Sequence, residues 1–101
     1  MRIIAGEARG RRLTAPAGDE TRPSSDKLRG ALFNILARRV WDAHVLDLFG
    51  GTGAMALEAL SRGARRAVIA DKSFEAVRCI RRNVEAVLPE GERDRAVVIQ
   101  T

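Results

Sequence analysis

The sequence has few of the residues that build metal centres, disulfide frameworks or membrane spans. Its 101 residues include one cysteine, Cys79, and one histidine, His44, so we expect neither an internal disulfide nor a metal site. Tyrosine is absent, proline occurs three times and aromatic residues make up 4%. No apolar run approaches the roughly 20 residues of a membrane-spanning helix, and the polar first residues do not fit a secretory signal peptide. These absences favour a cytoplasmic globular domain that does not enter a membrane.

Positive charge is concentrated in the first two-fifths of the chain. The formal net charge is +5. Residues 1–40 hold nine basic and four acidic residues, whereas residues 41–101 hold nine of each. Sixteen of the eighteen basic residues are arginine, whose planar guanidinium suits phosphate groups. A basic segment on a neutral body favours a polyanionic partner such as nucleic acid; the alternative is an ordinary solvated surface.

The first forty residues predict a small β-hairpin followed by a helix. Residues 2–15 contain two short strand-like stretches around a glycine turn, and residues 16–20 are rich in turn formers. A helix is expected from Ser24 or Ser25, either of which can cap it, to about Arg39. Its apolar face is expected to consist of Leu28, Leu32, Phe33, Ile35 and Leu36.

The remaining residues alternate between strand-like and helix-like patterns. Strands are expected at 44–49, 66–71 and 96–100, with helices at 54–61 and from a Ser73 cap to just before Pro89. This alternation predicts right-handed crossovers and a parallel sheet. The predicted fold class is α/β: the first βαβαβ half of a Rossmann-like sheet, preceded by the hairpin and helix. Half a sheet leaves apolar surface and a strand edge exposed, so we expect a fragment, or a domain that another chain completes.

A glycine-rich loop at Asp47–Gly53 follows the first strand of that sheet and predicts a ligand site. From Gly51, the residues Gly-Thr-Gly-Ala-Met-Ala fit the dinucleotide fingerprint G-x-G-x-x-G/A. Asp71 ends the next strand, eighteen residues after Gly53, where a carboxylate can accept both ribose hydroxyls. From these residues alone, the ligand could be NAD or any other cofactor that carries adenosine.

Asp47 discriminates between these ligands. It stands at the end of its strand, at the rim of the expected crevice. A carboxylate there repels a pyrophosphate and attracts a sulfonium or ammonium group, which favours S-adenosylmethionine over NAD. The alternative role, accepting N–H groups of the loop itself, is compatible with either ligand.

Several blocks of the sequence, in the right order, resemble one family. They are Asp47–Gly53 with Leu57–Ala64, and upstream Arg2–Gly6, Gly10–Leu13 and Thr21–Arg29. Together they resemble the RsmD family of bacterial 16S rRNA guanine-N2 methyltransferases. The resemblance implies a class I methyltransferase fold, S-adenosylmethionine as cofactor, and 16S rRNA or the small ribosomal subunit as partner.

The resemblance also implies roles for individual residues. Residues 1–40 would face RNA or close over the cofactor, and residues 41–101 would form an incomplete S-adenosylmethionine-binding domain. The implied RNA contacts are Arg11, Arg12 and Arg22; for Arg22, holding its loop against the next helix is an equal alternative. The implied cofactor-binding residues are Asp47, Phe49, Gly51, Gly53, Asp71 and Lys72.

The sequence departs from the family pattern in one respect. The family presents the guanine amine through an Asn/Asp-Pro-Pro-Tyr/Phe motif, but the three prolines here are unpaired and tyrosine is absent. We therefore assign no catalytic residue and expect this chain to be inactive alone. Other interpretations are a DNA adenine amine methyltransferase, an NAD-binding oxidoreductase fragment, and a catalytically inactive RNA-binding truncation.

Overall fold

A computed structural model describes residues 1–15 and 23–101. The loop expected at 16–20 and the expected RNA contact Arg22 lie outside the described residues. In chain order the elements are α1 (Pro23–Leu36), the 3₁₀ helix η1 (Ala37–Val40), β1 (His44–Asp47), α2 (Ala54–Ser61), β2 (Arg66–Asp71), α3 (Phe74–Val87), the 3₁₀ helix η2 (Glu90–Arg95) and β3 (Ala96–Gln100).

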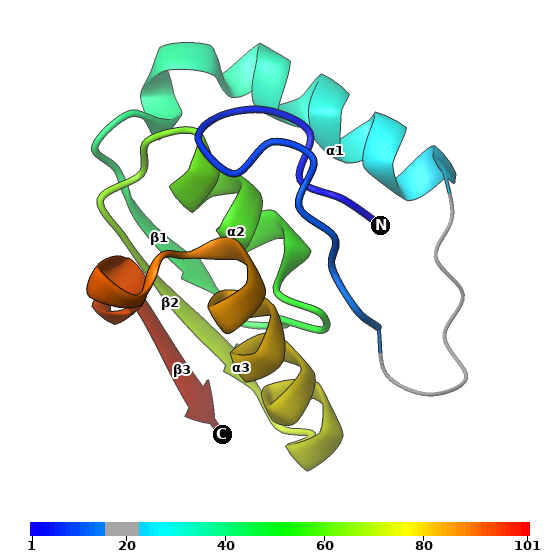
Figure 1. Cartoon of the computed structure of the whole chain (residues 1–101), viewed down its shortest axis with the longest axis vertical. Coiled ribbons are helices and arrows are strands. Elements are labelled where there is room, and N and C mark those ends of the chain that lie inside the picture. Colours follow the sequence, from blue (N-terminus) through cyan, green and yellow to red (C-terminus); the bar gives the residue numbers. More distant parts are fainter. Residues whose placement is uncertain (16–22) are drawn as a thin grey trace.

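The three strands form one parallel sheet in the order β1-β2-β3. The residues Leu46, Val68 and Val97 are in register across it. Helices α2 and α3 both pack on the same face of the sheet (Figure 1). Ser73 caps α3 by accepting a hydrogen bond from the N–H of Ala76. The predicted βαβαβ unit and its fold class are therefore confirmed.

The opposite face of the sheet exposes apolar side chains. Leu46 is 65% exposed, Ile99 41% and Val97 38%. Within the described residues, β1 pairs on one side only, with β2. Both features are those expected of a three-stranded unit whose second face has no covering layer.

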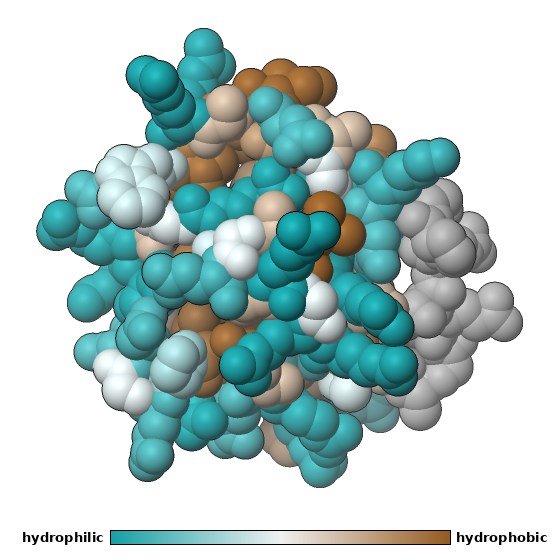
Figure 2. All heavy atoms as spheres, turned by 45° about the horizontal axis from the view of Figure 1, so that its top comes forward, coloured by the Kyte–Doolittle hydropathy of each residue, from teal (hydrophilic) through white to brown (hydrophobic). Residues whose placement is uncertain are grey.

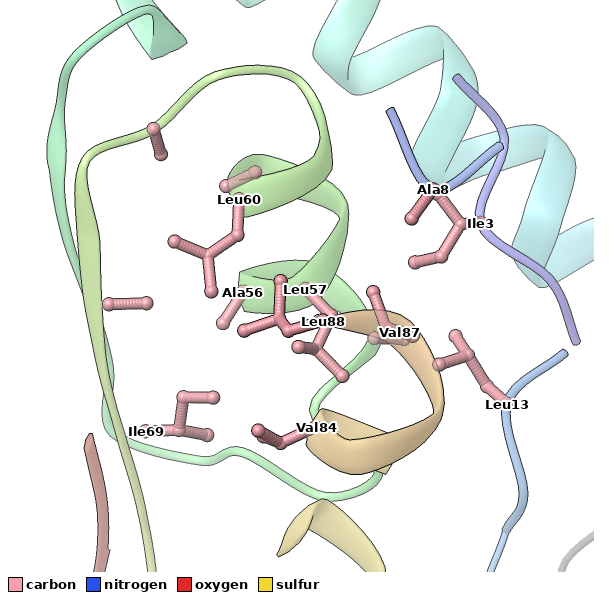
Figure 3. Close-up of a cluster of buried hydrophobic side chains, with 14 of the residues drawn as sticks. Ile3, Ala8, Leu13, Ala56, Leu57, Leu60, Ile69, Val84, Val87 and Leu88 are labelled. Atoms are coloured by element: carbon pink, nitrogen blue, oxygen red, sulfur yellow. The ribbon is translucent and has the colours of Figure 1, made fainter. Parts of the chain in front are cut away.

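The core lies between the sheet, the two crossover helices and the N-terminal segment. Leu57 and Leu60 of α2 are fully buried, as is Ile69 of β2. Ile3 and Leu13, from residues 1–15, point into the same cluster (Figure 3). The basic N-terminal residues therefore share one hydrophobic core with the Rossmann-like unit.

Residues 1–15 pair with themselves over a single antiparallel bridge, Arg2 to Arg12, rather than as two full strands. The segment lies across α2, between α1 and α3 (Figure 1). Its turn includes Gly6 at φ +90°, where a Cβ would stand 2.0 Å from the carbonyl oxygen of Ser61. Only glycine allows this approach, so the hairpin is shaped by its contact with α2.

Helix α1 differs from its prediction in three ways. It begins at Pro23, before the serines expected to cap it. It ends at Leu36, because Ala37 adopts a left-handed φ of +46° and a 3₁₀ turn follows. Of the expected apolar face, Phe33 is buried and Leu36 half-buried, whereas three members are exposed: Leu28, Leu32 and Ile35. The predicted apolar face is therefore buried only in part.

The molecular surface in Figure 2 is mainly hydrophilic, and hydrophobic side chains emerge on that face in separate small areas. Across the part of the chain that the structure describes, no helix has the length and apolar character needed to cross a membrane.

Candidate cofactor site

The glycine loop makes a tight turn between β1 and α2. Gly51 has φ +59° and Gly53 has φ +83°. Residues that carry a side chain rarely adopt this left-handed region. The N–H of Gly53 donates to the carbonyl of Gly50 at 2.7 Å, and Gly53 is the N-cap of α2. The loop thus delivers the positive end of the α2 dipole to the carboxyl edge of the sheet.

Gly50 anchors the loop to the rest of the fold. Its N–H donates to the carbonyl of Ala70 at 2.9 Å. A Cβ at this position would lie 2.6 Å from Cγ2 of Ile69 and 2.8 Å from Cδ1 of Ile80. Glycine is required here for packing rather than for φ, a role that the G-x-G pattern alone did not indicate.

Asp71 lies beside the loop at the end of β2. Its Oδ1 accepts the N–H of Ser73 at 2.9 Å, and its Oδ2 accepts the N–H of Gly51 at 3.1 Å. These hydrogen bonds, that of Ser73 first, hold the pKa of Asp71 below its ordinary value. The carboxylate is only half-buried, so each oxygen keeps lone pairs that a ribose hydroxyl can approach.

Asp47 ends β1 at the same edge of the sheet, because β1 and β2 are parallel neighbours. Its Oδ1 accepts the N–H of Phe49 at 3.1 Å, so the alternative role of bonding the loop's own N–H is present. Phe49 is 89% exposed. Lys72 is also exposed, and its carbonyl accepts from the side-chain amide of Gln100. The structure thus gathers every predicted cofactor residue at the carboxyl ends of β1 and β2.

Two of the expected RNA contacts lie on the N-terminal segment. Arg11 and Arg12 are exposed, and Arg11 donates to the carbonyl of Ala86 at the end of α3. The same segment reaches the glycine loop through its first residue, since the hydroxyl of Thr52 lies 3.6 Å from Sδ of Met1. Cofactor loop and basic segment are therefore neighbours.

A buried carboxylate on α2, Glu58, holds the N-terminal part in place. Its oxygens accept the N–H groups of Ile4 at 2.9 Å and Ala5 at 3.1 Å. They also pair with Arg29 of α1 at 3.2 Å and Arg62 at 2.8 Å. Glu58 is fully buried. The Arg62 pair has the i,i+4 spacing of a helical ion pair, but no local pattern links Ile4, Ala5 or Arg29 to this acid, so the network was missed from sequence.

An apolar groove of about 400 Å³ opens beside the site, between α1, β1 and α2. Asp47 and Met55 line its end near the loop, and Phe33, Val45 and Leu46 line its walls. Among the described residues, no group of three or more His, Cys, Asp or Glu side chains could hold a metal ion.

The fold is that of class I methyltransferases. The C-terminal domain of a precorrin-6Y C5,15-methyltransferase from Rhodobacter capsulatus superposes with a TM-score of 0.67 at 23% identity, over 86% of this chain and 43% of that one. The solved structure of yhhF from Escherichia coli gives a TM-score of 0.83 at 40% identity, over 100% of this chain and 52% of that one.

Residues 1–100 match the model of a family described as "Conserved hypothetical protein 95", and the chain belongs to this family, the RsmD family. The protein named Ribosomal RNA small subunit methyltransferase D from Escherichia coli K12 is 49% identical over 69 residues, covering 68% of this chain and 35% of that protein. The Haemophilus influenzae protein of the same name is 30% identical over 97 residues, covering 96% and 50%. The chain thus spans half or less of the length of these curated relatives.

Proposed function

We propose that this chain forms the cofactor-binding part of an S-adenosylmethionine-dependent rRNA methyltransferase. The observation that carries the proposal is the glycine loop held between two carboxylates, Asp47 and Asp71, at the carboxyl edge of a class I methyltransferase sheet. Relatives named as small-subunit rRNA methyltransferases support the choice of reaction and of RNA.

The residues at this edge fit an adenosine cofactor with a positive charge. Asp71, kept ionised by its two backbone hydrogen bonds, would accept the ribose hydroxyls. Asp47 would face the cationic end, and Phe49 and Lys72 would border the adenosine. Gly51 and Gly53 would let the backbone approach the ligand closely. When bound, S-adenosylmethionine supplies an electrophilic methyl group.

The acceptor we assign is the exocyclic N2 of a guanine in 16S rRNA, presented as RNA or in the small ribosomal subunit. Family membership and the basic first forty residues support this assignment. We assign these residues, with Arg11, Arg12 and Arg22, to RNA contact or cofactor closure, and residues 41–101 to cofactor binding. The two ranges differ in their proposed function but do not form separate domains, since both contribute to one hydrophobic core.

The chain would act by positioning the methyl donor, and we assign it no catalytic residue and no activity alone. The exposed apolar face around Leu46 and Val97, together with the open edge of β1, is where further strands would complete the sheet.

The test of the proposed site is the Asp71→Ala variant. Loss of the ribose contact should weaken binding of S-adenosylhomocysteine at least about tenfold, as expected when a charged hydrogen-bond partner is removed. Isothermal titration calorimetry measures this affinity. The control variant Asp94→Ala removes an exposed acid from η2, which precedes the amino end of β3, away from the carboxyl ends of the strands. It should bind S-adenosylhomocysteine with the affinity of the wild type. Equal affinities for the Asp71 variant and the wild type would refute the ribose role.

A further inference from the structure

A buried amide on α3, Asn83, contacts the glycine loop directly. Asn83 is fully buried, and its Nδ2 donates to the carbonyl of Thr52 at 2.8 Å and to that of Thr14 at 2.9 Å. Its Oδ1 accepts the N–H of Thr14 at 2.8 Å and the Thr14 hydroxyl at 3.0 Å. Both ends of the amide are therefore satisfied: Oδ1 by the N-terminal segment, and Nδ2 by that segment and the loop together.

The contacts with Thr14 determine how the amide is oriented. The backbone N–H of Thr14 is a donor only, so the atom facing it must be the acceptor Oδ1 of Asn83. Nδ2 then faces Thr52, in the middle of the loop. The amide cannot rotate without losing bonds at both ends.

The bond to Thr52 fixes one peptide unit of the loop. In a planar trans peptide the carbonyl and the following N–H point in opposite directions. The Thr52 carbonyl points to Asn83, and the N–H of the same peptide, on Gly53, donates to Gly50 at 2.7 Å. This peptide is thus held from both sides, directly before the first turn of α2.

We propose that Asn83 is a positioning residue for the cofactor site: by holding the Thr52–Gly53 peptide, it keeps the glycine loop in the conformation that binds the methyl donor. This inference rests on the proposed function for the identity of the ligand. Asn83 contacts the loop from the buried side of the fold. Its effect on the ligand therefore comes only through the loop. Without its donor, the Thr52 carbonyl is left unsatisfied next to the core, and the loop loses its preorganised shape.

The decisive variant is Asn83→Asp, which has nearly the same shape and keeps the acceptor for Thr14 but loses both N–H donors when ionised. At about pH 8 it should bind S-adenosylhomocysteine roughly tenfold more weakly than the wild type. Burial raises the pKa of such a carboxyl, and its protonated form regains an O–H donor. Affinity should therefore recover on lowering the pH to about 5.5, whereas the wild type should change little.

Two control variants separate positioning from general damage. Val84→Ala weakens the core at the next residue of α3 but removes no hydrogen-bonding side-chain group. Asn34→Asp makes the same chemical change on the exposed side of α1. Neither should show a pH-dependent affinity. An Asn83→Asp variant that still binds as tightly as the wild type above about pH 9, beyond the range to which burial raises a carboxyl pKa, overturns the proposal. So does one whose affinity is weakened at high pH and does not recover at low pH.

Hydrogen exchange of the Gly53 amide, measured by NMR without ligand, makes the test independent of the proposed function. The amide should exchange at least about tenfold faster in Asn83→Asp than in the wild type, since the peptide is held from one side only. Failure of the wild-type protein to bind S-adenosylhomocysteine would count against the proposed function. Unchanged Gly53 exchange would count against the role of Asn83.

Discussion

At the scale of single residues, the site depends on backbone N–H groups that donate hydrogen bonds to two carboxylates. Asp71 accepts two backbone N–H groups, one from the glycine loop and one from the start of α3. Asp47 accepts one, from Phe49. The two bonds to Asp71 stabilise its ionised form, and Asp47 lies at the same edge of the sheet.

The lowered pKa of Asp71 predicts how binding depends on pH. A group whose pKa is depressed by folding contributes stability above its unfolded value, about 3.9 for aspartate, and loses it as the pH falls through the folded value. Binding of S-adenosylhomocysteine should therefore stay constant from about pH 7 to about pH 5 and weaken only below the ordinary aspartate range. Calorimetric titrations at a series of pH values test this. A loss of affinity centred above pH 5 or so would contradict the assignment of Asp71.

At the scale of the elements, the loop depends on close packing against β2 and α3. Gly50→Ala places a Cβ 2.6 Å from Ile69 and 2.8 Å from Ile80. The neighbours must shift, and overpacking of this kind costs about 1–3 kcal/mol. Urea denaturation should show a lower free energy of unfolding by that amount.

Gly91→Ala is the matched control for this prediction. A Cβ at Gly91 meets nothing within 4 Å, and the residue is exposed in η2. Its free energy of unfolding should stay within about 0.5 kcal/mol of the wild type. Equal destabilisation of the two variants would show that the space around Gly50 is not the cause.

The elements that sequence predicts well are those with a strong local pattern. The continuous apolar runs of β2 and β3, the Ser73 cap and the glycine after α2 are each visible in the chain, and each was found where expected. The loop with Asp47 and Asp71 follows from the same strand-to-helix pattern.

The elements that sequence predicts less well are those shaped by distant contacts. The N-terminal segment has a single bridge because the N–H groups of Ile4 and Ala8 donate to Glu58 and Ser61 of α2 rather than across the hairpin. Helix α1 exposes Leu28 and Ile35, although their spacing is that of a buried face. Several hydrogen-bond partners of Glu58 and Asn83 lie 25 or more residues away in the sequence, so no local pattern reveals these contacts.

At the scale of the whole molecule, the fold brings the part of the chain with the excess positive charge next to the glycine loop. The basic N-terminal segment lies over α2, next to the cofactor loop, rather than on a separate domain. A polyanion attracted to it would therefore be held close to the proposed cofactor site. Electrostatic attraction of this kind raises local concentration and guides association.

Salt dependence of RNA binding tests this arrangement. Affinity for a 16S rRNA fragment should fall steeply as salt is added, because phosphate contacts release counterions. Arg12→Ala should reduce the slope of log affinity against log salt by roughly 1. Arg65→Ala, which removes an arginine already paired with Asp42 at 2.7 Å, should leave the slope unchanged. A flat salt response in the wild type would make the basic segment an ordinary surface.

The central claim is that the glycine loop between Asp47 and Asp71 binds a cationic adenosine cofactor rather than a dinucleotide. Parallel calorimetric titrations of the chain with S-adenosylmethionine and with NAD test it most directly. We expect saturable binding of S-adenosylmethionine and no heat of binding with NAD over the same concentrations, because a carboxylate at the loop repels a pyrophosphate. Saturable binding of NAD, without a response to S-adenosylmethionine, would contradict the account.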